Sequence, residues 1–180
     1  IEAIERAVFS GRDLTRQLLA YAGKGQFFRE AIDLSRFMKE AGQLLAVSNT
    51  PSSELIYQLG EDLPAIEVDP AQLHQIVMNL VTHALDPLRS AGGQVTVRTE
   101  QIHATRAFLD SCLGGEGLPE GSYVVLEVQD TGVGIEPESM SKIFDPFFTT
   151  KSEGRGLGLA ALLGIVRGHG AALTIAGTLG

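Results

Sequence analysis

Apolar residues recur along the first part of the chain at alternating spacings of three and four positions. The stripe runs from Ile1 to Ala22 and stops before Gly23 and Gly25. This period predicts one amphipathic helix that ends at the glycines. The pattern fits a helix packed on its own domain and the end of a helical dimerisation hairpin equally well, so periodicity alone leaves both interpretations open.

Shorter segments with other periods follow this leader. Alternating or continuous apolar runs predict strands over 27–34, 55–59, 65–68, 94–102, 122–129 and 171–176. Helical spacing predicts one helix capped by Ser35 and running through Leu45, a second that begins at Asp69–Pro70 and runs to about Asp86, and a third over 157–166. The polar, glycine-rich segment between 104 and 121 predicts a flexible loop.

Composition and charge narrow the class of protein. The length of 180 residues fits one domain with an appendage. The formal net charge of −8 argues against a nucleic-acid partner. The single cysteine, Cys112, allows no internal disulfide, so we expect a reducing compartment and interpret this thiol as a neutral loop residue. No apolar run approaches the roughly 20 residues that span a bilayer. Because the chain starts at Ile1 without a methionine, we interpret it as a fragment.

Two glycine clusters flank an aromatic, lysine-bearing segment between Asp130 and Ala161. Glycine lets backbone amides approach phosphate closely, and the second cluster stands at the start of the predicted helix over 157–166, where free amides and the helix dipole favour an anion. The spacing Gly156-x-Gly158-x-x-Ala161 also fits a dinucleotide fingerprint. We reject that interpretation because a loop precedes the glycines and no acidic residue follows them. A nucleotide remains the expected ligand.

A polar stripe on the predicted helix over 70–86 offers further candidates. Gln75, Asn79 and His83 are spaced four apart and therefore lie on one face of an otherwise apolar helix. A solvated face would explain each of these residues taken singly. Two amides and an imidazole in register, together with the two glycine clusters later in the chain, favour a ligand site.

Four segments occur in the order and spacing of a known family: DPAQLHQIVMNLVTHA (Asp69–Ala84), DTGVG (Asp130–Gly134), FDPFFTTK (Phe144–Lys151) and GRGLGL (Gly154–Leu159). They resemble, in turn, the N box, the first glycine box, the F box and the second glycine box of the ATP-binding domain of sensor histidine kinases, in the GHKL superfamily (HATPase_c type). The resemblance covers about 27–180. Residues 5–21 resemble the end of the second helix of the kinase dimerisation domain, which favours the hairpin interpretation of the leader.

The resemblance implies an α+β fold of the Bergerat type, a two-layer α/β sandwich in which one mixed sheet is covered on one face by helices. Residues 1–24 would be the C-terminal part of the second dimerisation helix, and residues 25–180 the ATP-binding catalytic domain with its final strand truncated. The implied function is to bind ATP with Mg²⁺ and to donate the γ-phosphate to a histidine of the dimerisation domain. That histidine would lie before Ile1, so the fragment alone is not expected to autophosphorylate.

The same resemblance implies the setting of the domain. A receiver domain of a response regulator would take the phosphoryl group next. The parent protein would be a homodimer. The domain itself would be cytoplasmic, in a parent that could be anchored in the inner membrane.

The resemblance also implies roles for single residues. Asp130 would accept a hydrogen bond from the adenine amino group, and Gly132 and Gly134 would give the base room. Asn79 would offer its carbonyl oxygen to Mg²⁺, and Lys151 would neutralise phosphate charge. The full set of expected nucleotide contacts is Asn79, His83, Ala84, Asp130, Gly132, Gly134, Ile135, Lys151, Gly156, Leu157, Gly158 and Leu159; the catalytic set is Asn79, Gln75 and Lys151, with Asn79 as the metal ligand.

The segment Thr149–Arg155 would form a short lid over the nucleotide, with Phe147 and Phe148 as core anchors beneath it. Gln75 stands where hydrolysing relatives carry a water-activating glutamate. Because an amide cannot act as a general base, we expect weak intrinsic ATPase activity.

Two departures from the family pattern affect the expected site. His83 replaces the second asparagine of most members, as in chemotaxis-type kinases, and Pro87 stands where a small residue is usual and should end the helix early. These departures leave a pseudokinase or scaffolding module as one alternative, and a GHKL-type ATPase is the enzyme alternative. The other histidines are interpreted as surface or structural residues: His74, His103 and His169.

Overall fold

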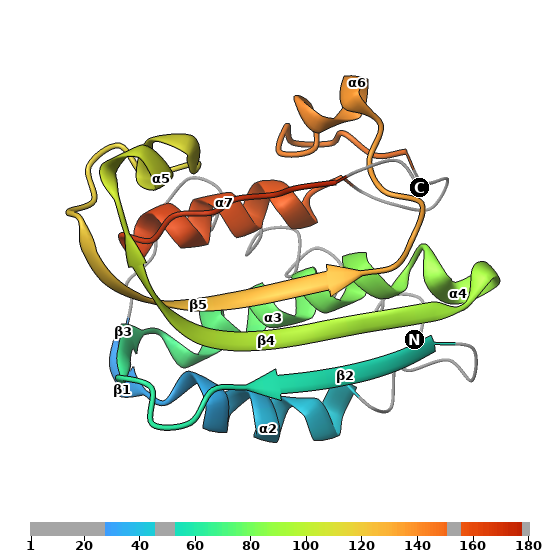
Figure 1. Ribbon diagram of the computed structural model, residues 1–180. Helices are drawn as coiled ribbons and strands as arrows, with labels where there is room; N and C mark the ends of the chain where they lie inside the picture. The colour runs from blue at the N-terminus through green and yellow to red at the C-terminus, as the bar shows by residue number, and fades with distance from the viewer. Residues whose placement is uncertain (1–27, 46–52, 151–155, 178–180) are drawn as a thin grey trace, which may run out of the picture.

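The computed structural model describes residues 28–45, 53–150 and 156–177. The elements, in chain order, are β1 (Glu30–Ile32), α2 (Leu34–Leu45), β2 (Ser53–Leu59), β3 (Ile66–Val68), α3 (Pro70–Leu85), α4 (Leu88–Ala91), β4 (Gly93–Ala104), α5 (Arg106–Ser111), β5 (Gly121–Asp130), α6 (Pro137–Met140) and α7 (Gly158–Gly168) (Figure 1). The predicted leader helix and Lys151 lie outside the described residues. No described helix is long and apolar enough to cross a membrane.

The main sheet has three strands in the order β2-β4-β5, with β2 parallel to β4 and β4 antiparallel to β5. A separate antiparallel pair joins β1 to β3. Helices α2 and α3 lie behind the three-stranded sheet in the view of Figure 1, and α7 lies beside α3. The fold is therefore α+β, with a mixed sheet and covering helices, as the sequence predicts.

The main core fills the space between the sheet and the helices α2 and α3. Alternation along β4 directs Val95 and Val97 inward, and both are fully buried together with Val77 and Val81 of α3 and Met38 of α2. Burial of each such side chain contributes on the order of 2 kcal/mol. Because the apolar face of α3 is fixed in this way, its polar stripe lies on the opposite, accessible side of the helix.

The starts of two helices test the capping predictions. Asp69 caps α3 as predicted, since its Oδ1 accepts hydrogen bonds from the amides of Ala71 at 2.9 Å and Gln72 at 3.2 Å. The prediction of Ser35 as the cap of α2 is wrong. Asp33 Oδ1 accepts from the Arg36 amide at 3.0 Å instead, and α2 begins at Leu34. The Ser35 hydroxyl is buried and lies 2.7 Å from Gly60 O.

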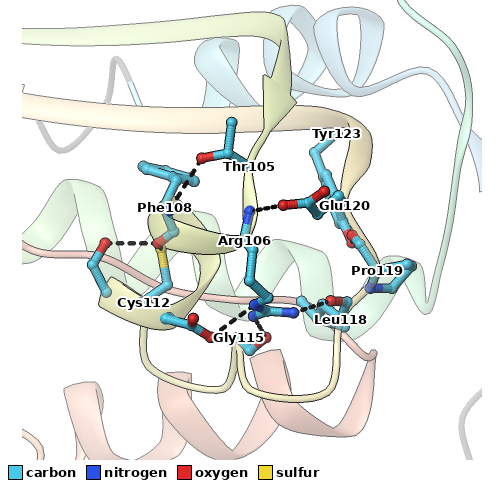
Figure 2. Close-up of polar contacts among 11 residues, drawn as sticks. Thr105, Arg106, Phe108, Cys112, Gly115, Leu118, Pro119, Glu120 and Tyr123 are labelled. Atoms are coloured by element: carbon cyan, nitrogen blue, oxygen red, sulfur yellow. Dashed lines mark hydrogen bonds and ion pairs between the residues drawn. The ribbon is translucent and has the colours of Figure 1, made fainter.

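The segment predicted as a flexible loop over 104–121 contains a helix, so that prediction is wrong. Thr105 caps α5, and the Arg106 guanidinium donates to Leu118 O and Gly115 O, both at 2.7 Å (Figure 2). The side chain of Arg106 thus satisfies two carbonyl groups of a glycine-rich segment, which local periodicity does not reveal. Cys112 is buried at the end of α5 and donates to Phe108 O at 3.2 Å.

The strand predicted over 171–176 is reduced to a single antiparallel bridge between Leu173 and Leu113. The two residues exchange hydrogen bonds of 2.8 and 3.0 Å. The apolar segment therefore pairs with the residue Leu113, which follows α5 and lies 60 positions earlier in the chain. No local sequence pattern indicates this partner. At the other predicted boundary, α3 ends at Leu85 with Asp86 as its C-cap, directly before Pro87, as expected.

Candidate nucleotide-binding site

Strand β5 carries Asp130 to its C-terminal end, where the carboxylate is exposed. Its Oδ1 accepts a hydrogen bond from the Gly132 amide at 2.8 Å, and this local turn fixes the side chain. The bond leaves Oδ2 available to a ligand. Thr131 holds the turn against β4, because its hydroxyl accepts from the Gln94 amide at 3.0 Å while its own amide donates to Gln94 O at 3.1 Å.

The first glycine box requires glycine at two positions for different reasons. A Cβ on Gly132 would lie 2.7 Å from Asp130 Oδ1 and 3.1 Å from Pro87 Cβ, so there is no room for a side chain. Gly134 has φ +77°, a conformation that favours glycine. Pro87 therefore forms a wall of the first glycine turn, a role that the sequence does not indicate because the contact spans 45 positions.

The polar stripe of α3 meets the start of α7. The Asn79 amide nitrogen donates to Gly158 O at 3.1 Å, which leaves its side-chain oxygen for a cation. One turn later, His83 Nε2 lies 2.7 Å from the position that a Cβ on Gly158 would take. Gln75 lies one turn before Asn79 and is half-buried. Ala84 is 5% exposed and belongs to the core beneath the stripe.

Gly156 of the second glycine box lies against Phe147 and Phe148 of the F box. The Phe147 amide donates to Gly156 O at 2.9 Å, and a Cβ on Gly156 would collide with the backbone of Phe147 and Phe148. Gly156 also has φ +64°, so both space and conformation require glycine there. The expectation that Phe147 anchors the core is wrong, because the residue is 66% exposed, whereas Phe148 is half-buried. Phe147 also has a φ of +70°.

Helix α7 presents its N-terminus to this region. Leu157 is buried at the cap position, and no side-chain hydrogen bond caps the helix among the residues described. The amides of the first turn, which includes Leu159, are therefore available to an anion, and the helix dipole favours negative charge at this end. No acidic residue lies in the first turn to oppose it.

The geometry joins these parts through α3. Its middle contacts the start of α7 through Asn79 and His83, and Pro87 just beyond its end contacts the first glycine turn. Ile135 is half-buried directly after Gly134. The exposed carboxylate, the closely packed glycine backbones and the start of α7, which no described side chain caps, suit a purine nucleotide with its phosphates. Lys151 and the rest of the lid over 151–155 lie outside the described residues.

The donor set also suits a magnesium ion held together with phosphates. Within 28–45, 53–150 and 156–177, no three histidine, cysteine, aspartate or glutamate side chains gather as a metal cluster. The Asn79 oxygen is a hard ligand of the kind that Mg²⁺ accepts, with phosphate oxygens and water completing its shell.

The fold and the site define a nucleotide-binding domain of the Bergerat type. The chain belongs to the family of histidine kinase-, DNA gyrase B- and HSP90-like ATPases, whose profile matches residues 68–180. Within this family it is a catalytic ATP-binding domain of the histidine kinase type.

Among its curated relatives, the sensor kinase CckA of Brucella abortus (strain 2308) is 40% identical over 159 residues, which is 87% of this chain and 16% of that protein. The sensor histidine kinase ZraS of Escherichia coli (strain K12) is 30% identical over 148 residues, 82% of this chain and 28% of that protein. The chain thus spans less than a third of either relative. Because these relatives are sensor kinases, neither the scaffolding module nor the GHKL-type ATPase is favoured.

Solved structures similar to this chain include those of ThkA and ShkA. The catalytic domain of histidine kinase ThkA gives a TM-score of 0.59 at 25% identity and covers 81% of this chain and 82% of its own. Full-length ShkA in complex with AMPPNP gives a TM-score of 0.71 at 22% identity and covers 99% of this chain and 35% of its own. The second similarity is one of fold.

Proposed function

We propose that this domain binds ATP with Mg²⁺ and donates the γ-phosphate to a histidine of a dimerisation domain, as part of a two-component sensor histidine kinase. The observation that carries the proposal is the contact between the polar stripe of α3 and the start of α7, where no side chain of the described residues caps the helix. It holds one candidate metal ligand, Asn79, beside one candidate phosphate site.

Each residue contributes a distinct function in this proposal. Asp130 Oδ2 accepts a hydrogen bond from the adenine amino group, while Oδ1 stays bonded to the Gly132 amide. The Asn79 oxygen holds Mg²⁺, which supplies charge neutralisation on the phosphates when bound. The first amides of α7 and Lys151 bind the phosphates and align the terminal one with an acceptor.

Gln75 favours transfer to a protein side chain over transfer to water. It lies on the same face of α3 as Asn79 and is half-buried. An amide does not take a proton from water, so hydrolysis lacks a general base at this position. The proposal therefore includes weak intrinsic ATPase activity.

One relative supports a response regulator as a partner. Histidine kinase ThkA has been solved in complex with the response regulator protein TrrA. We extend that pairing to this chain and assign a receiver domain as the second acceptor, with residues 1–24 as part of a dimerising helix in a homodimeric, cytoplasmic arrangement. Anchoring of the parent in the inner membrane belongs to the same proposal.

The test is phosphorylation of the longer protein that contains this domain. Incubation with γ-labelled ATP and Mg²⁺ should give a phosphoryl group that is labile in acid and stable in base, as expected for phosphohistidine. Asp130→Asn should lose most of the label, because an amide nitrogen would then face the adenine amino group. Equal labelling of wild type and Asp130→Asn would contradict the proposal.

A further inference from the structure

We propose that His83 and Gly158 are a sterically matched pair, in which His83 is a positioning residue that sets where α7 begins and so directs its first amides towards the phosphates. The inference rests on the proposed binding of a nucleoside triphosphate. It assigns His83 a function through Gly158, and it explains why residue 158 is glycine.

The backbone of Gly158 does not require glycine. Its φ lies outside the left-handed range, unlike that of Gly156, which has φ +64°. An alanine would therefore fit the helical backbone at 158. The obstacle is the imidazole of His83, whose Nε2 would lie 2.7 Å from the new Cβ, with Cδ2 at 3.6 Å and Cε1 at 3.7 Å. The ring packs directly against the Cα of Gly158.

Two side chains of α3 thus contact the same residue. Asn79 donates to the carbonyl oxygen of Gly158 at 3.1 Å, and His83 lies against its Cα. One contact sets the orientation of the peptide group, and the other sets how closely the helix approaches. Both side chains project from a helix whose opposite face is buried at Val77 and Val81, so the pair has a fixed base.

Helix α7 has little freedom to absorb a change at this point. Its residues Ala160–Val166 are all buried, and it starts at Gly158. A methyl group inserted between Gly158 and His83 must therefore move the first turn or the imidazole. Because phosphate binding depends on where the amides point, the effect should appear in the affinity for phosphates, with adenine binding unchanged.

A competing explanation is that Gly158 gives a phosphate room to approach the backbone. The two explanations differ in one respect. A steric match with His83 is relieved when the imidazole is removed, whereas a clash with a phosphate is not relieved. A double variant therefore separates them.

The experiment is calorimetric titration of the 180-residue chain with AMPPNP and with adenosine. Gly158→Ala should weaken AMPPNP binding by about tenfold, the scale expected for a displacement of less than 1 Å, with adenosine binding within about twofold of wild type. His83→Ala alone should also weaken AMPPNP binding, because the start of α7 loses the contact that positions it. Gly158→Ala combined with His83→Ala should recover most of the lost AMPPNP affinity, because the new methyl group then takes part of the space of the imidazole. Gly117→Ala is the matched control, since a Cβ there meets nothing within 4 Å, and His103→Ala is the exposed histidine control.

Two results would overturn the proposal. One is wild-type affinity for AMPPNP in Gly158→Ala, and the other is a double variant that binds AMPPNP no better than Gly158→Ala. A second measurement remains available if the Gly158→Ala chain does not fold. It compares the backbone amide NMR chemical shifts of wild type with those of His83→Ala, both without nucleotide. The pair predicts shifts at Gly158 and Leu159 that exceed those elsewhere in α7; their absence would refute it. Because this readout needs no nucleotide, it stands even where wild type fails to bind AMPPNP and the proposed function fails.

Discussion

Tyr57 shows how a close contact between a strand and a helix can leave a buried hydroxyl group without a hydrogen bond among the described residues. Tyr57 of β2 directs its hydroxyl group against α2, where a Cβ on Gly42 would lie 2.8 Å from the oxygen. The hydroxyl is buried and has no hydrogen-bond partner within the described residues. Burial raises the pKa of Tyr57 above its usual value of 10.0. Glycine at 42 and tyrosine at 57 thus give a close contact between helix and strand at the cost of an unsatisfied polar atom.

Tyr57→Phe should therefore raise the free energy of unfolding by about 1 kcal/mol, because it removes an unpaired buried hydroxyl and keeps the ring. The raised pKa of Tyr57 also determines how the stability of the wild type changes with pH. The folded state keeps the Tyr57 proton to higher pH than the unfolded state, so wild-type stability falls as pH rises above about 10, where the unfolded tyrosine ionises. Urea unfolding of both proteins at pH 8 and near pH 10.5 should show a larger advantage for the variant at the higher pH.

A comparison variant gives the opposite sign at neutral pH. The Tyr123 hydroxyl donates to Pro119 O at 2.6 Å, so Tyr123→Phe removes a hydrogen bond and should lower stability (Figure 2). A loss of stability in Tyr57→Phe at pH 8 would contradict the account of an unsatisfied hydroxyl.

At the scale of elements, the end of α7 and the start of α3 are held together by one polar cluster. The Asp69 amide donates to His169 Nε2 at 3.1 Å, which places the ring proton on Nδ1, 2.9 Å from Ile165 O. Asp69 Oδ2 accepts from the Phe28 amide at 3.0 Å, and Arg29 donates to Gly168 O at 2.8 Å. His169 is thus a structural histidine, in agreement with the interpretation of its sequence context.

His169→Ala should lower the free energy of unfolding by about 1–2 kcal/mol, because it removes the acceptor of a buried amide and the side-chain bond to the end of α7. Asp69 is 8% exposed, so water does not easily replace the lost acceptor. Urea unfolding measures the effect. His103→Ala, at an exposed position of β4, serves as the control and should change stability by less than about 0.5 kcal/mol. Equal stabilities of the two variants would contradict the structural role of His169.

Elements also show which predictions depend on local sequence. The cap at Asp69 and the strand that ends at Asp130 were predictable, because capping chemistry and apolar alternation act within a few residues. The helix α5 and the bridge at Leu173 were not, because the Arg106 contacts and the pairing with Leu113 join segments through space. Ser35 illustrates the same limit: its hydroxyl is engaged by Gly60 O instead of capping α2.

At the scale of the whole molecule, α3 connects the two glycine boxes. The sequence predicts that Gln75, Asn79 and His83 share a face and that the glycines surround a nucleotide, and the family match confirms an ATP-binding domain. The sequence does not predict that Asn79 and His83 both contact Gly158, or that Pro87 packs on Gly132. These contacts arise from the packing of α3 against α7 and the end of β5, which no local pattern encodes.

The proposed function places Asp130 and Asn79 in one Mg²⁺-dependent ATP site. The most direct test is calorimetric titration of this chain with AMPPNP, with and without Mg²⁺, in wild type, Asp130→Asn and Asn79→Asp. Wild type should bind AMPPNP in the micromolar range, Asp130→Asn should lose binding, and Asn79→Asp should lose the Mg²⁺ dependence. Absence of binding by folded wild type, or unchanged binding by Asp130→Asn, would contradict the proposed function.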